Sequence, residues 1–314
     1  MGSKINKNQS NGLNSTSDNL SNEDTSKFED GRKYHSVKNS TYFLPSDNEE
    51  ADRLHLQHYI LKNVWQSTFS APVEHLLNQE GAKVLDAGTG AGSWLFEMAT
   101  EYPKAKFIGI DIAPIQSSHT KPSNVEMIKG NILERLPFDD NTFDYVFQRT
   151  LYVGIPENKW PSVINEFVRV LKPDGYLELS EADFKSGTMG PATTKVTDAI
   201  LGMFREHGLD PNVCYKLQNY FEEHKQLHDV HCEKKEKLDA KNAEELRKLS
   251  TENYITAMMT LKPKLASMME VSYYEYDDLI KKMGEELINL ESFNPQGNIT
   301  KKFYNNIPAV KNLG

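Results

Sequence analysis

Short apolar segments alternate with segments of helical periodicity between residues 83 and 183. The apolar segments predict strands, and residues 93–101 and 159–171 have the spacing of helices. Strands that alternate with helices form right-handed crossover units, which gives a parallel sheet with helices on both faces. The sequence therefore predicts an α/β fold with a doubly wound, mostly parallel, Rossmann-like sheet. The five strand-like segments are residues 84–85, 107–110, 125–128, 143–147 and 176–179.

The segments on either side of this core differ from it in composition. Residues 1–27 are rich in Asn and Ser and poor in large apolar side chains, so we expect a disordered tail. Residues 28–82 contain several aromatic residues and a predicted helix over 51–69, and we expect them to cover the core. The core itself spans residues 83–184. Residues 185–314 are mostly helical in pattern, and we expect a helical cap that adds the last strands of a seven-stranded sheet.

The composition argues against several classes of protein. The chain has 36 Lys and Arg against 45 Asp and Glu, a net charge of −9, which disfavours duplex nucleic acid as a partner. Two cysteines, Cys214 and Cys232, are too few for a disulfide framework. The sequence has no apolar run of about 18 residues and no secretory pattern at its N-terminus. We therefore expect an intracellular protein, cytoplasmic or nuclear, without membrane contact.

A glycine-rich turn joins the first strand of the core to its first helix, where an open parallel sheet binds ligands. Gly88, Gly90 and Gly92 let the backbone approach a nucleoside closely, because they carry no Cβ. A dinucleotide fold expects a third glycine where this chain has Ser93. Asp86 would repel a pyrophosphate and attract a cation. The expected ligand is adenosine-like and positively charged, as S-adenosylmethionine is, and a nicotinamide oxidoreductase is disfavoured.

The ends of the next two strands supply groups for the rest of such a ligand. Asp111 follows Gly92 by 19 residues and is expected to accept hydrogen bonds from both ribose hydroxyls. Asn131 would accept one from the adenine amine, with the backbone of Ile132 facing the ring. Each of these residues alone is also typical of a turn or a helix cap, but the groups at the three strand ends together match the parts of one ligand. The cofactor contacts predicted on these strand ends are Asp86, Ala87, Gly88, Gly90, Gly92, Asp111, Ile112, Asn131 and Ile132.

Residues 83–183 resemble the core of the class I methyltransferases. The similarity includes the glycine-rich turn, residues 136–144 (LPFDDNTFD) before the fourth strand and residues 170–176 (VLKPDGY) before the fifth. Asn131 stands where the family often has Asp, and residues 173–175 (PDG) replace the commoner Pro-Gly-Gly, but both changes keep the turn and the hydrogen-bonding capacity. The resemblance implies that S-adenosylmethionine is the cofactor.

The N-terminal segment further resembles the fungal LaeA-like methyltransferases, whose best-known members regulate secondary metabolism. The similar segments are residues 31–35 (GRKYH), 42–47 (YFLPSD) and 52–58 (DRLHLQH), and the whole resemblance covers roughly residues 28–230. In such folds the N-terminal segment closes over the cofactor, which implies a cofactor contact for Tyr42 and makes Tyr34 a catalytic candidate; both tyrosines are as well explained by packing.

The resemblance leaves two functions open. One is methyl transfer to a small-molecule or protein acceptor, and the alternative is a regulatory protein that keeps the fold and acts through protein partners. The fourth strand lacks the Asn/Asp-Pro-Pro-aromatic signature of DNA amino-methyltransferases and a cysteine for attack on cytosine. Residues 150–160 contain one glutamate, Glu157, where protein arginine methyltransferases have a pair.

The fourth and fifth strands end in residues with reactive side chains. Gln148 is a predicted cofactor contact, and Arg149 would pair with the substrate or with the cofactor's carboxylate. Glu181 and Asp183 are candidate bases or ammonium partners, unless they are solvated strand-end charges. Because methyl transfer depends mainly on positioning, a general base is optional. The catalytic candidates are therefore Glu181, Arg149 and Tyr34.

Two clusters in the C-terminal half have competing interpretations. A methionine and tyrosine cluster would form an adaptable apolar pocket or, as is commoner, ordinary core. A histidine and cysteine cluster has spacing that would suit zinc, but nothing closes a recognised site, so we expect a solvated surface and no metal. The first cluster comprises Met258, Met259, Met268, Met269, Tyr273, Tyr274 and Tyr276, and the second His224, His228, His231 and Cys232.

Overall fold

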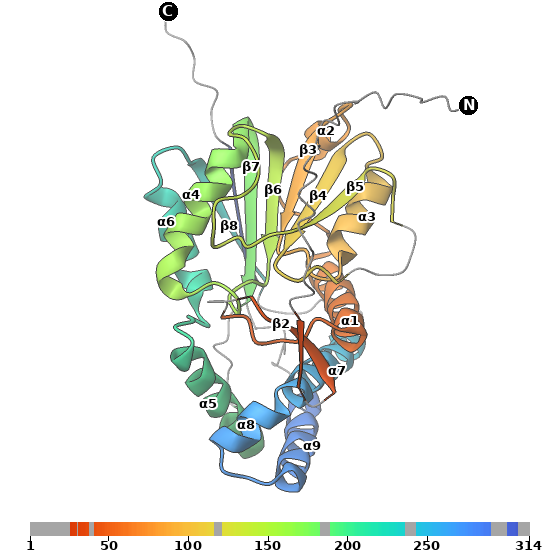
Figure 1. Ribbon diagram of the computed structural model, residues 1–314, viewed down its shortest axis with the longest axis vertical. Coiled ribbons are helices and arrows are strands. Elements are labelled where there is room, and N and C mark those ends of the chain that lie inside the picture. The colour runs from red at the N-terminus through yellow and green to blue at the C-terminus, as the bar shows by residue number, and fades with distance from the viewer. Residues whose placement is uncertain are drawn as a thin grey trace, which may run out of the picture.

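Five parallel strands form the centre of the molecule in a computed structural model that describes residues 26–29, 31–37, 41–115, 121–182, 189–235, 243–289 and 300–306. Their order in space is β5-β4-β3-β6-β7, so the sheet grows in opposite directions from β3 (Figure 1). This change of direction lies between β3 and β6, where such sheets bind ligands. The strands are β3 (Lys83–Ala87), β4 (Lys106–Asp111), β5 (Val125–Lys129), β6 (Phe143–Arg149) and β7 (Leu171–Ala182).

Two antiparallel strands continue the sheet beyond β7. β9 (Thr300–Asn306) pairs with β7, and β8 (His228–Lys235) pairs with β9. The last strand that the structure describes therefore lies between two earlier ones. The 3-10 turn η2 (Val213–Tyr215) and helix α6 (Leu217–Glu222) precede β8 in the chain, and α6 packs beside it.

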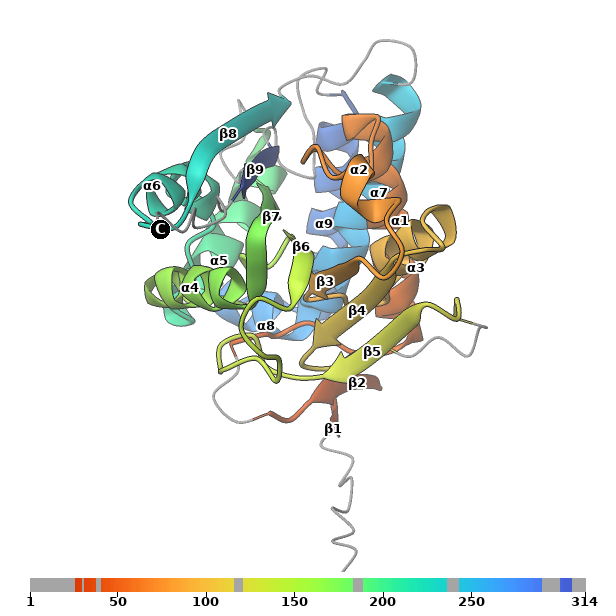
Figure 2. The same cartoon turned by 90° about the horizontal axis from the view of Figure 1, so that it is seen from above.

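Alternating side chains on the strands build two apolar layers. On β6, Tyr145 and Phe147 pack with α3 (Ser93–Glu101), whereas Val146 between them packs with α4 (Trp160–Val170) on the other face. Figure 2 shows α3 and α4 on opposite sides of the sheet. The predicted doubly wound parallel sheet with helices on both faces is therefore confirmed.

Further helices gather beyond one end of the sheet, below it in Figure 1. Helix α1 packs on α7, and α9 packs on both α5 and α7. Partly exposed Glu286 of α9 accepts hydrogen bonds from the backbone N–H groups of Ala192 (3.0 Å) and Thr193 (2.8 Å), which joins α9 to the first turn of α5. These helices are α1 (Asn48–Trp65), α5 (Pro191–Glu206), α7 (Ala243–Thr260), α8 (Lys262–Met268) and α9 (Tyr273–Asn289).

The helices of the sequence prediction differ from the observed ones in several places: α1 begins at Asn48 rather than at residue 51, and the helix predicted over 159–171 is α4 over 160–170. Helix α1 ends at Trp65 rather than at residue 69, because Gln66 adopts a left-handed conformation with φ of 55°. Helix α8 was not predicted. Two short elements, α2 (Glu74–Leu77) and η1 (Glu157–Lys159), were not predicted either. By contrast, α3 has the predicted bounds.

A β-hairpin precedes α1 and is tied to its first turn. It consists of β1 (Ser26–Glu29) and β2 (Arg32–His35), so β1 begins two residues inside the segment expected to be a tail. Residues 1–25 lie outside the described part of the chain. The guanidinium of Arg32 donates to both carboxylate oxygens of Asp47, at 2.6 and 2.8 Å, and Asp47 caps α1 by accepting from the Glu50 N–H at 3.0 Å.

None of the helices within the described ranges is long and apolar enough to cross a membrane.

Replacing Asp47 with Ala is expected to lower the free energy of unfolding by about 1–2 kcal/mol, because the substitution removes the N-cap of α1. Urea denaturation measures this change. Asp52→Ala, at an exposed position on the same helix, is the matched control and should have little effect. Equal losses in the two variants would contradict the capping role of Asp47.

Candidate functional site

A large cavity lies at the carboxyl ends of β3, β4 and β6, between the sheet and the helices beyond it. Its walls come from the strand-end turns, from the segment before α1 together with α1, and from α5 and α7. Eight of the predicted cofactor contacts and one catalytic candidate line it: Tyr42, Asp86, Gly88, Gly90, Asp111, Ile112, Asn131 and Ile132, with Arg149.

The glycine-rich turn has a backbone that side chains would not permit. Gly88, Gly90 and Gly92 all have positive φ angles, of 77°, 53° and 77°. A Cβ on Gly88 would lie 2.5 Å from a methyl group of Leu151, closer than any real contact. The Gly88 N–H donates to the backbone oxygen of Ile110 at 2.8 Å, which joins the turn to β4. The turn therefore requires glycine for both its conformation and its packing.

Asp86 places a buried carboxyl group beside this turn. Its side chain is 4% exposed and accepts a hydrogen bond from the Thr89 hydroxyl at 2.7 Å. Burial raises the pKa of Asp86 to about 7, although the Thr89 hydrogen bond and the positive charge of Arg149 oppose this shift. A cation bound beside Asp86 would therefore favour its ionised form.

Asp111 holds the turn from the neighbouring strand. One carboxylate oxygen accepts from the Gly90 N–H and the other from the Ala113 N–H, both at 2.9 Å. Burial raises the pKa of Asp111, while these backbone hydrogen bonds oppose the shift. At the end of β5, the side-chain oxygen of Asn131 accepts from the Leu133 N–H at 3.0 Å. Both residues therefore shape the turns that they line.

Arg149 ends β6 and brings a positive charge to the cavity. It is half-buried, and burial lowers the pKa of its guanidinium to about 10. Its Nη2 atom donates to His58 Nδ1 at 2.9 Å, and its guanidinium carbon lies 5.9 Å from the centre of the Phe147 ring. Across the described ranges, no carboxylate lies within ion-pair distance of this guanidinium.

Glu181 and Gln148 are fully buried and do not line the cavity. Glu181 accepts hydrogen bonds from the backbone N–H groups of Leu151 (2.7 Å) and Tyr152 (3.2 Å) and from the Gln148 side chain (2.5 Å). Burial raises the pKa of Glu181 to about 7. Glu181 thus supports the loop after β6, whose residues do line the cavity.

Four other predicted residues lie outside the cavity wall or outside the description. Ala87 is a buried strand residue, Gly92 is the N-cap residue before α3, and Tyr34 lies on β2; none of them lines the cavity. Asp183 lies outside the described residues.

One part of the cavity wall is mainly apolar and is here called the apolar lobe. It combines the segment before α1, the loop after β6, and helices α5 and α7. Its residues are Tyr42, Phe43, Leu44, Tyr152, Val153, Ile200, Phe204, Tyr254, Ala257, Met258 and Leu261.

A buried ion pair borders the apolar lobe. Arg53 donates from Nε and Nη2 to the carboxylate of Glu50, at 2.8 and 2.5 Å. Its Nη1 also donates to Asn253 of α7 at 3.4 Å, and the Asn253 side chain donates to the Arg53 backbone oxygen at 2.7 Å. These contacts join α1 to α7 across the cavity wall.

The residues that α7 supplies to the cavity were largely missed from the sequence. Asn253, Tyr254, Ala257 and Met258, with Leu261 directly after the helix, follow helical spacing, a signal that indicates one helix face but not what the face contacts. His58 and Arg53 belong to the segment that resembles LaeA-like proteins, but no pattern in the sequence predicted that His58 contacts Arg149 or that Arg53 contacts Asn253.

The two C-terminal clusters are dispersed by the fold. Of the methionine and tyrosine cluster, only Met258 lines the cavity, so the pocket hypothesis is wrong for the rest. Tyr276 is core, whereas Tyr273 and Tyr274 are exposed. In the other cluster, His224 contacts Asn165 at 2.9 Å, and the part of the chain that the structure describes contains no group of three metal-ligating side chains.

Comparison with known proteins identifies relatives that share about half of this chain. It is 33% identical over 157 residues to methyltransferase pytC of Aspergillus terreus, which is 49% of this chain and 46% of that protein. It is 33% identical over 168 residues to the protein-methionine methyltransferase laeA of Emericella nidulans, which is 50% of this chain and 41% of that protein. The alignments thus span less than half of either relative, and they confirm the resemblance to LaeA and other fungal methyltransferases.

Among solved structures, one similar chain is Haemonchus contortus phosphoethanolamine N-methyltransferase 2 in complex with S-adenosyl-L-methionine. It is 17% identical, with a TM-score of 0.47, and the match covers 81% of this chain and 57% of that one.

The family model of the methyltransferase domain matches residues 78–244, which contain the five parallel strands, the glycine-rich turn and Arg149. This match covers more than half of the 314 residues. The chain therefore belongs to the methyltransferase domain family.

Proposed function

We propose that this protein transfers a methyl group from S-adenosylmethionine to a small apolar molecule. The observation that carries the proposal is the charge pattern around the glycine-rich turn, where Asp86, Asp111 and Arg149 line one cavity. S-adenosylmethionine has an ammonium and a carboxylate at one end and a ribose and an adenine at the other. One cavity with two carboxylates and one guanidinium matches these groups in charge.

Each part of the cofactor has a proposed partner. Asp86 would hold the ammonium group and Arg149 the carboxylate. Asp111 would accept from the ribose hydroxyls, because each of its oxygens keeps a second lone pair beside its backbone hydrogen bond. Ile112 and Ile132 would flank the adenine. Glycine at the turn lets the backbone pass close to the ligand.

The remaining predicted residues have supporting roles in this proposal. Asn131 holds the turn after β5, and its second lone pair would face the adenine amine. Tyr42 lies in the segment that crosses the cavity. Gln148 would act indirectly, through its hydrogen bond to Glu181.

The residues present fit a cofactor with an ammonium and a carboxylate group. Asp86 is a buried acid, and the Thr89 hydroxyl is the hydrogen-bond donor that the described residues supply to it. Arg149 is a cation whose hydrogen bond goes to a neutral acceptor. A buried charge is costly until an opposite charge joins it. The two termini of an amino acid supply both missing charges.

Positioning and exclusion of water account for the chemistry of this site. S-adenosylmethionine would supply a methyl group on a positively charged sulfur; the acceptor's lone pair would bond to the methyl carbon in line with the breaking carbon–sulfur bond, and S-adenosylhomocysteine would leave. Helices α1, α5 and α7 line the cavity, and their apolar side chains exclude water, which strengthens the interactions between charges inside. Because Glu181 is engaged by Leu151, Tyr152 and Gln148, proton removal by Glu181 is not part of the proposal.

The apolar lobe supports a small apolar acceptor. Its wall includes three tyrosines and two phenylalanines, and the charge of Arg53, which borders it, is already paired with Glu50. A wall of this kind favours a ligand with apolar or aromatic surface over a charged peptide segment. The acceptor would supply its own lone pair, from a weakly acidic hydroxyl that has lost its proton to water or from a neutral amine that releases any surplus proton to water after methyl transfer.

Calorimetric titration is expected to detect binding of S-adenosylmethionine and no binding of NADH. Asp111→Asn should weaken S-adenosylmethionine binding by about tenfold or more, because it replaces an acceptor by a donor at the proposed ribose site. Asp139→Ala, at an exposed position, is the control and should bind normally. Binding of NADH but not of S-adenosylmethionine would overturn the proposal.

Affinity for S-adenosylhomocysteine should depend on the ionisation of Asp86. Because the pKa of Asp86 is about 7 without a bound cation, protonation below that pH competes with the ligand's ammonium group. Affinity should therefore fall by about tenfold between pH 7.0 and 5.5, a range in which the ligand's own amine stays protonated. Asp86→Asn should bind weakly with a flat pH profile. The same pH slope in that variant would exclude Asp86 as its cause.

Methyl-labelled S-adenosylmethionine, incubated with the protein and an extract of its source cells, should transfer label to the low-mass, solvent-extractable fraction. Ala257→Trp should abolish this transfer and leave cofactor binding intact, because the added ring fills the apolar lobe. Gly90→Arg gives the background. Label in the protein fraction would contradict the acceptor class. Absence of label above background would favour the alternative function, a regulator that acts through protein partners.

A further inference from the structure

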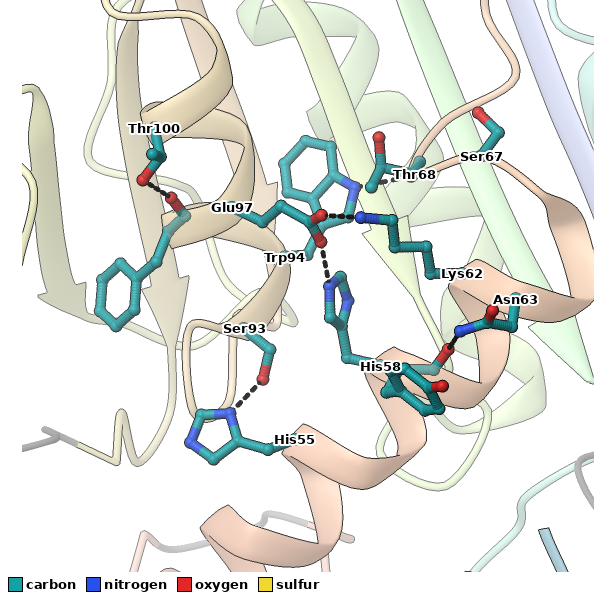
Figure 3. A network of polar contacts seen from close by, with 12 residues as sticks. His55, His58, Lys62, Asn63, Ser67, Thr68, Ser93, Trp94, Glu97 and Thr100 are labelled. Atoms are coloured by element: carbon teal, nitrogen blue, oxygen red, sulfur yellow. Dashed lines mark hydrogen bonds and ion pairs between the residues drawn. The ribbon is translucent and has the colours of Figure 1, made fainter. Parts of the chain in front are cut away.

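His58 connects the cavity to a polar network between α1 and α3. It lies in the middle of that helix, is 9% exposed and contacts residues of two other elements. Nδ1 of its ring is 2.9 Å from Nη2 of Arg149 on β6, and Nε2 is 2.6 Å from a carboxylate oxygen of Glu97 on α3. Figure 3 shows His58 directed toward Glu97, with Lys62 on the other side of the same carboxylate.

The two partners determine which ring nitrogen of His58 carries the proton. A guanidinium has donors and no acceptor, so His58 Nδ1 must accept from Arg149. A carboxylate accepts, so Nε2 must carry the proton and donate to Glu97. The ring is therefore neutral in this arrangement. Glu97, which also forms an ion pair with Lys62, fixes this tautomer by accepting the hydrogen bond from Nε2.

Burial and the positive charge of Arg149 keep His58 neutral. The groups that face it are Arg149 from β6, Glu97 from α3 and Lys62 from its own helix. Burial, and then the positive charge of Arg149, lowers the pKa of His58 to about 4, although Glu97 opposes the shift. His58 therefore remains a hydrogen-bond acceptor for Arg149 at neutral pH.

The contact also limits where the guanidinium can point. A guanidinium is planar and presents its five N–H donors in a rigid fork, so a hydrogen bond at Nη2 restricts the directions of the others. Arg149 lines the cavity, and its guanidinium carbon lies over the Phe147 ring, 5.9 Å from its centre. One acceptor and one ring together restrict the position of the fork.

We propose that His58 is a positioning residue that orients Arg149 toward the carboxylate of the bound cofactor. The inference rests on the proposed cofactor and adds a residue that does not itself touch it. Without His58, Arg149 would have to be ordered when the ligand binds, which costs affinity. Removal of His58 should therefore weaken binding of the amino-acid end of the ligand and leave binding of its adenosine end unaffected.

Two ligands and two substitutions test this role by calorimetry. S-adenosylhomocysteine has the amino-acid end, and 5′-deoxyadenosine lacks it. His58→Leu should weaken binding of S-adenosylhomocysteine by about tenfold or more, as expected for a lost hydrogen bond to a charged group, and should change 5′-deoxyadenosine binding less than about twofold. His58→Asn should recover most of the affinity, because the Asn oxygen can accept where Nδ1 does.

A neighbouring histidine supplies the matched control. His55 lies one turn earlier on α1 and also contacts α3, with Nδ1 2.7 Å from the Ser93 hydroxyl (Figure 3). It has no contact with Arg149, so His55→Leu should leave S-adenosylhomocysteine binding unchanged. Thermal unfolding of each variant verifies that it is folded.

The possible outcomes separate this inference from the proposed function. Equal weakening of both ligands by His58→Leu, or no weakening of either, would overturn the positioning role while the cofactor assignment stands. Failure of His58→Asn to recover affinity would also count against it. If the unaltered protein binds neither ligand, the proposed function itself fails, and the positioning role fails with it.

Discussion

The cavity depends on a backbone conformation that glycine adopts with the least strain. Three glycines after β3 have positive φ angles, and this conformation lets the turn donate hydrogen bonds to the end of β4 and to Asp111. A side chain at Gly88 would collide with Leu151 and displace the loop after β6, whose Leu151 N–H donates to Glu181. These contacts join the ends of β3, β4 and β6, and the joined ends determine the positions of Asp86 and Asp111.

The cavity is also closed on its other side by helices that lie far apart in the chain. Arg53 on α1 is bonded to Glu50 and to Asn253, so one buried ionic group joins the N-terminal helix to α7 two hundred residues later. A buried pair of this kind contributes little net stability, but it defines how two surfaces meet. Asp86 is buried and Arg149 is half-buried in this cavity, so their charges act more strongly than they would in bulk water.

The sequence predicted the sheet and the strand-end residues because these depend on local patterns. Periodicity separates strands from helices, and Asp86 and Asp111 follow directly from their place at strand ends. Contacts that depend on packing were not predictable: Glu181 is also at a strand end, yet it faces backbone N–H groups rather than the cavity. The lining residues of α7 and the contact between His58 and Arg149 arise only when separate helices pack on the sheet.

The strand order β7-β9-β8 also constrains how the chain folds. β9 is the last described strand in the sequence, yet it occupies the position between two strands that are made earlier. β8 therefore has no neighbour in the sheet until β9 arrives, and the edge of β7 stays unpaired during the same interval. The five parallel strands need no such late partner, so during synthesis the half of the sheet with the cofactor cavity can form first, and the antiparallel edge completes it afterwards.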